Sequence, residues 1–195
     1  MARTQYIFID YENVSESDLS RIDGKDARVF LIVGAHHKNL PTSLFLFAQD
    51  RPSQVRIIQT PVKGKNALDF VLTVELGARI KDDPDGYFHI ISKDTDFESV
   101  IKHLKSSGLR IARHAGIGEV AALRTPEERI SRLRDELQDT CKNRPSTRKT
   151  LENRILSLFE KQVDADFVAK TIDSLVKAGL LDFTENDKVL YNNAA

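Results

Sequence analysis

Four aspartates stand where short apolar runs give way to polar turns or to the first turn of a helix: Asp10, Asp69, Asp94 and Asp96. Carboxylates that are brought together repel one another strongly unless a cation is bound between them. Their hard oxygen atoms favour Mg²⁺ or Mn²⁺ over zinc. Such ions orient water, lower its pKa and stabilise charge on a phosphate under in-line attack. The pattern therefore predicts a metal site for phosphodiester chemistry.

Some of these acids also have a purely structural explanation. Asp94 could cap the helix that follows it, and Asp69, three residues after Asn66, could be the acidic partner in a capping arrangement. Asp10 has no such helix to cap, because it directly ends a buried strand. Glu12 is either a group that supports the site or a solvated turn residue.

An alternation of apolar runs and helical patterns would position the aspartates. We expect strands at Gln5–Asp10, Ala27–Val33, Val55–Gln59 and Tyr87–Ile91 and through Ile111, with helices at 16–22, 41–49, 66–80 and after Asp96. This alternation predicts a doubly wound parallel α/β sheet. If strand 4 returns beside strand 1, the strand order is 3-2-1-4-5 and a crevice opens between these two strands. Asp10, Asp94 and Asp96 would then meet at the crevice.

The C-terminal third has a different pattern. Thr125 to Glu128 form a capping box with proline at the first helical position, and that helix carries an apolar stripe expected to lie on the sheet domain. After a linker, two helices and a short hairpin follow in winged-helix order. We therefore divide the chain into a sheet domain at 1–124, a connecting helix and linker at 125–146, and a winged-helix-like domain at 147–195. About 50 residues is marginal for independent stability, so we expect this unit to dock or to pair as a homodimer.

Composition limits the class of protein. The 195 residues are 41% hydrophobic and 30% charged, as in a globular protein. No apolar run approaches the about 18 residues of a membrane helix, and no signal-peptide core is present, so no membrane partner is expected. The single cysteine, Cys141, excludes an intrachain disulfide and a cysteine zinc cluster, which points to the cytoplasm. Basic and acidic residues balance at 29 each, so nucleic acid would have to bind through local basic patches.

Two such patches are candidates. Lys63, Lys65, Lys93 and Arg113, with His36 and His37, lie near the predicted acidic site. Arg144, Arg148 and Lys149 form a strip at the start of the C-terminal domain, which is either a phosphate-contacting surface or a solvated helix face. The second helix there mixes lysines with aspartates, so RNA or protein contact is favoured over sequence-specific DNA binding.

Three segments resemble the signature segments of PIN-like nucleases, specifically the NYN branch: FIDYENV (8–14), KGKNALD (63–69) and ISKDTDFESVIKHLKSSG (91–108). The resemblance covers roughly residues 5–120. It implies a three-layer α/β/α sandwich of Rossmann-like type with strand order 3-2-1-4-5, and endonucleolytic cleavage, usually of RNA, with Mg²⁺ or Mn²⁺. It also implies that Asp10, Asp69, Asp94 and Asp96 are the catalytic metal-site acids, that Asn13 supports Asp10 and that Ser92 lines the acidic turn.

Lys93 departs from the family pattern, since many relatives carry a small residue there. The C-terminal segment is similar to winged-helix modules appended to this branch. The leading hypothesis is a metal-dependent endoribonuclease acting on single-stranded RNA. The alternative is a non-catalytic RNA-binding or regulatory adaptor on the same fold. A Toprim or phosphotransfer site is disfavoured, because Toprim sites need Glu where Asp10 stands and phosphoaspartate enzymes need Asp where Glu12 stands.

Overall fold

The computed structural model describes residues 3–16, 18–61, 63–139, 143–159 and 163–192. The chain divides into two compact units, Met1–Leu123 and Arg124–Ala195, and each is described by itself. Within the described residues, no helix is both long enough and apolar enough to cross a bilayer.

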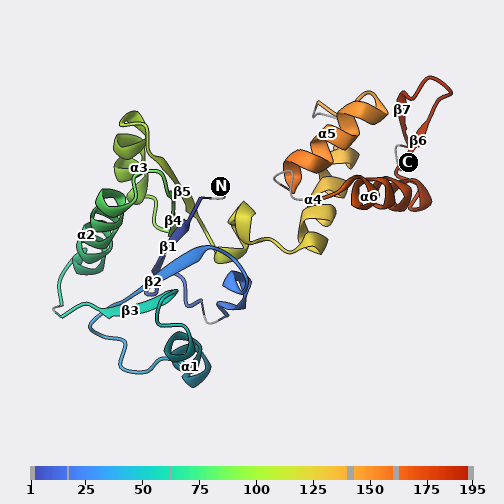
Figure 1. Ribbon diagram of the computed structural model, residues 1–195. Helices are drawn as coiled ribbons and strands as arrows, with labels where there is room; N and C mark the ends of the chain where they lie inside the picture. Colours follow the sequence, from blue (N-terminus) through green and yellow to red (C-terminus); the bar gives the residue numbers. More distant parts are fainter. Residues whose placement is uncertain (1–2, 17, 62, 140–142, 160–162, 193–195) are drawn as a thin grey trace. The chain divides into compact units, whose positions relative to one another are not determined.

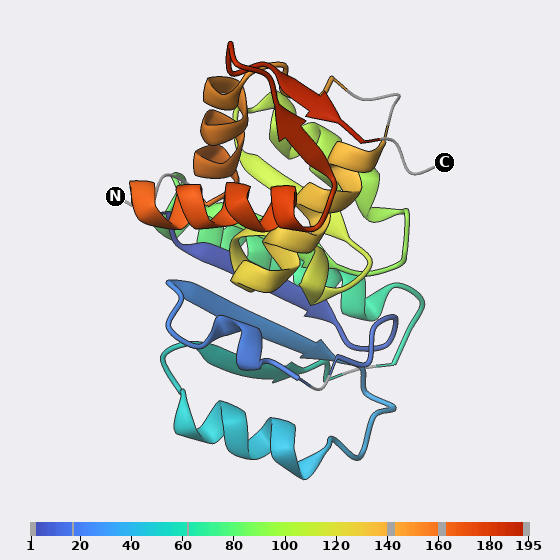
Figure 2. The same cartoon turned by 90° about the vertical axis from the view of Figure 1, so that its right-hand side faces the viewer.

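The first unit is built on a sheet of five parallel strands. They are β1 (Gln5–Asp10), β2 (Ala27–Val33), β3 (Val55–Gln59), β4 (Tyr87–Ile91) and β5 (Arg110–His114), in the order β3-β2-β1-β4-β5. Figure 2 shows β1 and β2 pointing in the same direction. The predicted strand order is confirmed. Because β4 lies beside β1, the chain reverses its winding there, and the ends of these two strands share one crevice.

Alternate side chains of the central strands enter two separate cores. On β1, Tyr6 and Phe8 pack against α2 (Ala67–Asp82) and α3 (Phe97–Ser106). Ile7 and Ile9 face the opposite core, which is covered by α1 (Thr42–Asp50) and the 3-10 turns η1 (Ser20–Ile22), η2 (Ile117–Glu119) and η3 (Ala121–Leu123). Figure 1 shows α2 and α3 together, away from α1. The result is a three-layer sandwich in which even-numbered β1 residues, Asp10 included, face the α2 side.

Two local expectations for this unit are wrong. Among the described residues of the helix expected at 16–22, only Ser20–Ile22 form a helical turn, of 3-10 type, and the carboxylate of Asp18 accepts a hydrogen bond from the backbone N–H of Ser20 (2.9 Å). This local bond competes with helix formation. Asn66 precedes α2 in a left-handed conformation (φ 59°), and its side chain makes no capping hydrogen bond. Asn66 therefore does not cap the helix.

The second unit has a core of three helices and a hairpin. Its elements are α4 (Pro126–Gln138), α5 (Arg148–Leu158), α6 (Ala165–Lys177), β6 (Leu181–Phe183) and β7 (Val189–Tyr191). The capping box of Thr125 and Glu128 is confirmed. Thr147, just before α5, forms an antiparallel bridge with Lys188 beside the hairpin. The order is thus helix, bridge, helix, helix, hairpin.

The apolar stripe of α4 is buried inside the second unit. Leu133 and Leu137 are buried in one cluster with Leu151, Ile155 and Leu175 of the second unit. The expected docking of this helix on the sheet domain is therefore wrong. The physical reason is that two short helices and a hairpin bury little apolar surface, and a third amphipathic helix completes their core.

Candidate metal centre

Five acids form the carboxylate cluster: Asp10, Glu12, Asp69, Asp94 and Asp96. Asp10 is the only one of the five that is buried. It ends β1 with 1% of its surface exposed, and the register that pairs Ile9 with Ile91 brings Ser92 beside it. The Ser92 hydroxyl and the Asn13 side-chain amide each donate to Asp10 Oδ2 at 2.8 Å, and the Asn13 backbone N–H donates to Oδ1 at 3.2 Å. A buried carboxylate needs such partners. Because all three donors are neutral, they fix Asp10 without cancelling its charge.

The acidic turn after β4 is held by its own side chains. The Ser92 hydroxyl, besides donating to Asp10, accepts from the Asp94 backbone N–H at 3.0 Å, and Asp94 Oδ1 accepts from the Asp96 N–H at 2.9 Å. Asp94 thus closes the turn before α3 rather than capping the helix interior. Asp96 is the N-cap residue, yet its side chain makes no capping bond. The capping explanation therefore accounts for neither carboxylate.

Asp69 joins the cluster from the neighbouring helix. It lies half-buried in the first turn of α2. Its pKa is raised, first by burial and then by the negative charges of Asp10, Asp94, Glu12 and Asp96. Four other carboxylates, from the segments after β1 and β4, are therefore close enough to act on this one group. The alternative role of Asp69 in a capping arrangement with Asn66 is not realised, because the Asn66 side chain makes no cap bond.

Gly34 makes room for Glu12, a contact that the sequence reasoning missed. The register that pairs Asp10 with Ile32 places residues 12 and 34 side by side, two residues beyond that pair. A Cβ atom built on Gly34 would lie 1.5 Å from Glu12 Oε1. Any side chain at position 34 would therefore displace the Glu12 carboxylate. The signal that could have revealed this was a glycine directly after the buried strand Ala27–Val33.

The donor chemistry of the cluster fits a hard divalent cation. In the described part of the chain, none of Asp10, Glu12, Asp69, Asp94 and Asp96 forms an ion pair with a basic side chain. Their oxygen atoms are the ligand type that Mg²⁺ and Mn²⁺ prefer. Among the described residues, no group of three or more Asp, Glu, His or Cys side chains is close enough together to hold a metal ion as the structure stands. The five acids share the carboxyl edge of the sheet, and four of them act electrostatically on Asp69.

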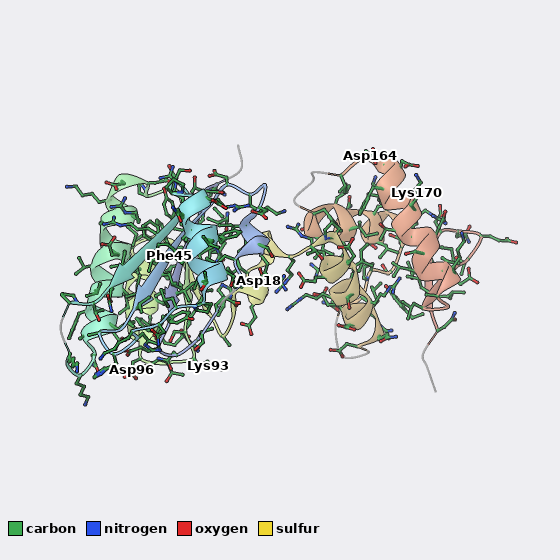
Figure 3. All side chains as sticks on the ribbon, turned by 90° about the horizontal axis from the view of Figure 1, so that it is seen from below. Asp18, Phe45, Lys93, Asp96, Asp164 and Lys170 are labelled. Atoms are coloured by element: carbon green, nitrogen blue, oxygen red, sulfur yellow. The ribbon has the colours of Figure 1, made fainter. Side chains whose placement is uncertain are left out.

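The predicted basic residues around the cluster divide into two kinds. Lys63, Lys65 and Lys93 are exposed and, within the described residues, form no ion pair. Figure 3 shows Lys93 and Asp96 along the same edge of the first unit. Arg113 differs, because it donates to Glu98 Oε1 at 2.8 Å and to the Ser92 carbonyl oxygen at 3.0 Å. Its guanidinium supports the acidic turn rather than standing free for a phosphate.

The two predicted loop histidines follow β2. His36 is exposed, whereas the ring of His37 packs edge-on against Tyr11, with 5.5 Å between ring centroids. His37 thus helps to pack the residue between Asp10 and Glu12.

The predicted basic strip of the second unit is occupied by internal contacts. Arg144 donates to the Leu137 carbonyl oxygen at 2.9 Å and covers the Tyr191 ring at 4.4 Å. Arg148 pairs with Asp187 at 3.0 Å, and Lys149 lies 3.6 Å from Glu152. These three cations therefore have contacts within their own unit, and their binding of phosphate stays a prediction. Cys141 lies outside the described residues.

A sequence model of the PIN domain matches residues 4–114, more than half of the chain. The chain belongs to the PIN domain family. PIN domains are generally nucleases, bind nucleic acid and usually use divalent metal ions such as Mg²⁺ or Mn²⁺. No curated protein matches the chain.

The PIN domain match coincides with the sheet. It begins one residue before β1 and ends at the last residue of β5, so it includes all five acids of the cluster. The second unit lies beyond it. The PIN domain therefore accounts for the nuclease-type fold of the first unit.

Proposed function

We propose that this PIN domain is an Mg²⁺- or Mn²⁺-dependent endoribonuclease that hydrolyses phosphodiester bonds in single-stranded RNA. One observation carries the proposal: within the described residues, five acids gather without a basic partner at the carboxyl edge of the sheet, around the buried Asp10. Burial first, and then repulsion from the other four carboxylates, raises the pKa of Asp69. Such repulsion opposes folding unless a cation binds there. The three segments similar to the NYN branch support RNA as the substrate.

Each residue of the cluster has a distinct role in this proposal. Asp10, Asp69, Asp94 and Asp96 would hold the metal. A bound divalent cation supplies positive charge against the phosphate and makes a nearby water more acidic. Ser92 and Asn13 keep the Asp10 carboxylate in one orientation through their 2.8 Å hydrogen bonds. Glu12, seated over Gly34, adds negative charge from the far side of Asp10.

The exposed lysines would bind the RNA backbone. Lys63 and Lys65 precede α2, and Lys93 lies between Ser92 and Asp94 in the acidic turn. Their free ammonium groups can contact phosphates on either side of the cleaved bond. Arg113 is left out of this set because Glu98 and the Ser92 carbonyl already occupy it.

We further infer that the second unit is a winged helix that binds substrate or a partner protein. Support comes from its element order, in which an isolated bridge between Thr147 and Lys188 lies beside the β6–β7 hairpin. A cytoplasmic location agrees with the single cysteine in the sequence. Deleting the whole second unit, residues 124–195, should weaken RNA binding or change the oligomeric state. If neither changes, this assignment is wrong.

The proposed activity is tested by incubating the full chain with labelled single-stranded RNA, duplex RNA and DNA in Mn²⁺, Mg²⁺ or EDTA. We expect cleavage of single-stranded RNA that requires metal and that Asp94→Asn abolishes. Asp85→Asn is the matched control, because Asp85 is an exposed aspartate before β4, at the opposite edge of the sheet. It should cleave like the wild type.

Two results would contradict the proposal. Equal cleavage by the wild type and Asp94→Asn would point to a contaminating nuclease. RNA binding without cleavage by the wild type would instead favour a non-catalytic RNA-binding adaptor on the same fold.

A further inference from the structure

A groove between α2 and α3 begins at the carboxylate cluster. Its first part is a cavity of about 240 Å³, with Asp69 and Asp96 among its lining residues and with Phe70, Phe97 and Val100 as apolar walls. A second cavity of about 410 Å³ continues along the same two helices and shares Thr73, Ser99 and Val100 with the first. The groove is therefore acidic at its beginning and mainly apolar beyond it.

Phe70 differs from the other apolar residues of this groove because most of its surface is exposed. The core stripe of α2 is formed by Leu68, Leu72 and Leu76, whereas Phe70 leaves 68% of its surface exposed. It directly follows Asp69 in sequence and lines the cavity with Asp96. An exposed aromatic face beside a phosphate-cleaving centre matches what single-stranded nucleic acid needs, because a nucleobase can stack on it whatever its sequence.

Asn66 supplies polar groups at the same cavity. It lines the cavity with Phe70, and in the described part of the chain its side-chain amide has no hydrogen-bond partner. An amide offers both a donor and an acceptor to the edge of a base. Its left-handed backbone (φ 59°) is a conformation that asparagine adopts more readily than most residues. The site thus combines a stacking face with an edge-reading group.

Charge favours an RNA base over a protein segment as the occupant. Lys65 precedes Asn66, and Lys93 lies in the turn that carries Asp94 and Asp96, so free cations stand on both segments beside the acids. A nucleotide has an anionic phosphate for cations and an uncharged, flat base for an apolar wall. A purely apolar peptide would leave the lysines and acids at the beginning of the groove without partners.

We propose that Phe70 and Asn66 receive an unpaired base of the RNA next to the phosphate that is cleaved, with Phe70 stacking on the base and Asn66 contacting its edge. This inference rests on the proposed nuclease function and makes it more specific. A paired base cannot enter the groove, because its edge is already engaged in the duplex. The groove would thereby explain a requirement for single-stranded substrate.

Binding of a short oligoribonucleotide to the full chain tests the proposal, with Asp94→Asn present in every protein to prevent cleavage. Phe70→Ala should weaken binding about 10- to 100-fold, the range that alanine substitution of stacking aromatics gives. Phe70→Tyr should restore binding to within about threefold, because it keeps the stacking face. Val74→Ala is the matched control, one turn further along α2 and 71% exposed, and should bind like the parent protein.

An oligoribonucleotide with one abasic position, moved along the chain, gives the second arm. At one position the loss of the base should weaken binding by the parent protein and remove most of the difference from Phe70→Ala. Three results would overturn the inference. Phe70→Ala and Val74→Ala could bind equally well, or the protein could bind no RNA at all. The third is that Phe70→Ala weakens binding by the same factor wherever the abasic position stands. Melting temperatures check that all variants are folded.

Cleavage, measured separately with Asp94 intact, distinguishes the two proposals. Metal-dependent cleavage without any Phe70 effect on binding would leave the nuclease assignment standing and overturn the base site. If RNA binding depends on Phe70 but the protein does not cleave RNA, the base-binding site would stand and the nuclease assignment would be wrong.

Discussion

The two edges of the parallel sheet treat acidic side chains in opposite ways. At the amino edge, where strands begin, Asp23 pairs with Arg51 at 3.0 Å, Asp85 lies 3.8 Å from Arg110, and Asp83 accepts a hydrogen bond from the Tyr6 hydroxyl. At the carboxyl edge, where strands end, none of the five clustered acids forms an ion pair within the described residues. The amino edge thus gives some of its acids a basic partner, whereas the five clustered acids at the carboxyl edge have none among the described residues.

This difference separates stability from function. Paired acids at the amino edge are at worst neutral for folding, whereas like charges in close proximity oppose it. The neutral donors Ser92 and Asn13 hold Asp10 in place but leave the repulsion intact. We therefore propose that the carboxyl edge binds a cation, and each prediction below compares this edge with the amino edge or with a group elsewhere in the fold.

The largest effect is expected for Asp96→Ala. If Asp96 is a metal-site acid, RNA cleavage should fall by more than about 100-fold, since even groups that only support a ligand are worth 10- to 100-fold. The stability of α3 should change little, because this side chain makes no capping hydrogen bond. Cleavage rates and thermal melting measure both. Asp85→Ala at the amino edge should leave cleavage unchanged. A loss of stability with normal cleavage would make Asp96 a structural cap.

A smaller effect is expected for Ser92→Ala. The variant removes the donor to Asp10 and the acceptor for the Asp94 backbone N–H, so both carboxylates lose their orientation. Mn²⁺ affinity should fall about 10- to 100-fold. Ser106→Ala is the control, because Ser106 is exposed at the far end of α3 and bonds only within that helix. Unchanged Mn²⁺ affinity in Ser92→Ala would show that the buried bond does not tune the site.

His89 tests burial without nearby acids. It is 3% exposed on β4, contacts His114 at 3.1 Å and Gln5 at 2.9 Å, and packs on Tyr87. Burial, with a smaller contribution from His114, lowers its pKa to about 3. The unfolded chain therefore takes up more protons below about pH 6.5, and stability should fall as the pH drops from there toward 3. At pH 5 the loss is about 2 kcal/mol.

Denaturant unfolding at pH 7.5 and pH 5 measures this loss. His89→Gln should reduce the difference in unfolding free energy between the two pH values, because glutamine does not titrate. His36→Gln should keep the full difference, since His36 is already exposed. An identical pH dependence in all three proteins would show that His89 is not buried as a neutral group.

The smallest effect is expected for Asp69→Asn in EDTA. The raised pKa of Asp69 means that its protonated form is favoured in the folded protein, so the stability it contributes at low pH is lost as the pH rises through the folded-state pKa. At neutral pH the charged group destabilises the fold. Removing the charge should raise the unfolding free energy by less than about 1 kcal/mol, because solvent screens a half-buried group.

Asp82→Asn is its control. Asp82 is the last residue of α2, and its carboxylate lies 3.1 Å from Arg79, so neutralising it should bring no gain. If Asp69→Asn were destabilised in EDTA, the acids at the carboxyl edge would not be in mutual repulsion.

Much of the sheet and of the acid cluster could be predicted from the sequence. Apolar runs buried on both faces mark parallel strands, and right-handed crossovers then limit the strand order. That order alone brings Asp10 beside the turn of Asp94 and Asp96. The spacing of apolar side chains was therefore enough to predict the positions of residues that the strand order fixes, such as Asp10, Asp94 and Asp96.

Properties that depend on a tertiary partner could not be predicted. Arg113 looked like a free cation until Glu98 and the Ser92 carbonyl stood beside it. The Glu12 contact needed the register of β1 and β2, which places Gly34 next to it. The apolar residues of α4 have the helical spacing of a buried stripe, but this spacing does not indicate which of the two units buries the stripe. A charged side chain or an amphipathic face indicates in the sequence that a partner is required, but it does not indicate which residues provide that partner.

Calorimetric titration with Mn²⁺ tests the central claim most directly, because it measures cation binding without any substrate. The wild type should bind Mn²⁺ with a saturable signal. Asp94→Asn at the carboxyl edge should bind at least about tenfold more weakly. Asp85→Asn at the amino edge should bind like the wild type. Equal Mn²⁺ binding by Asp94→Asn and the wild type, or no binding by the wild type, would contradict the account.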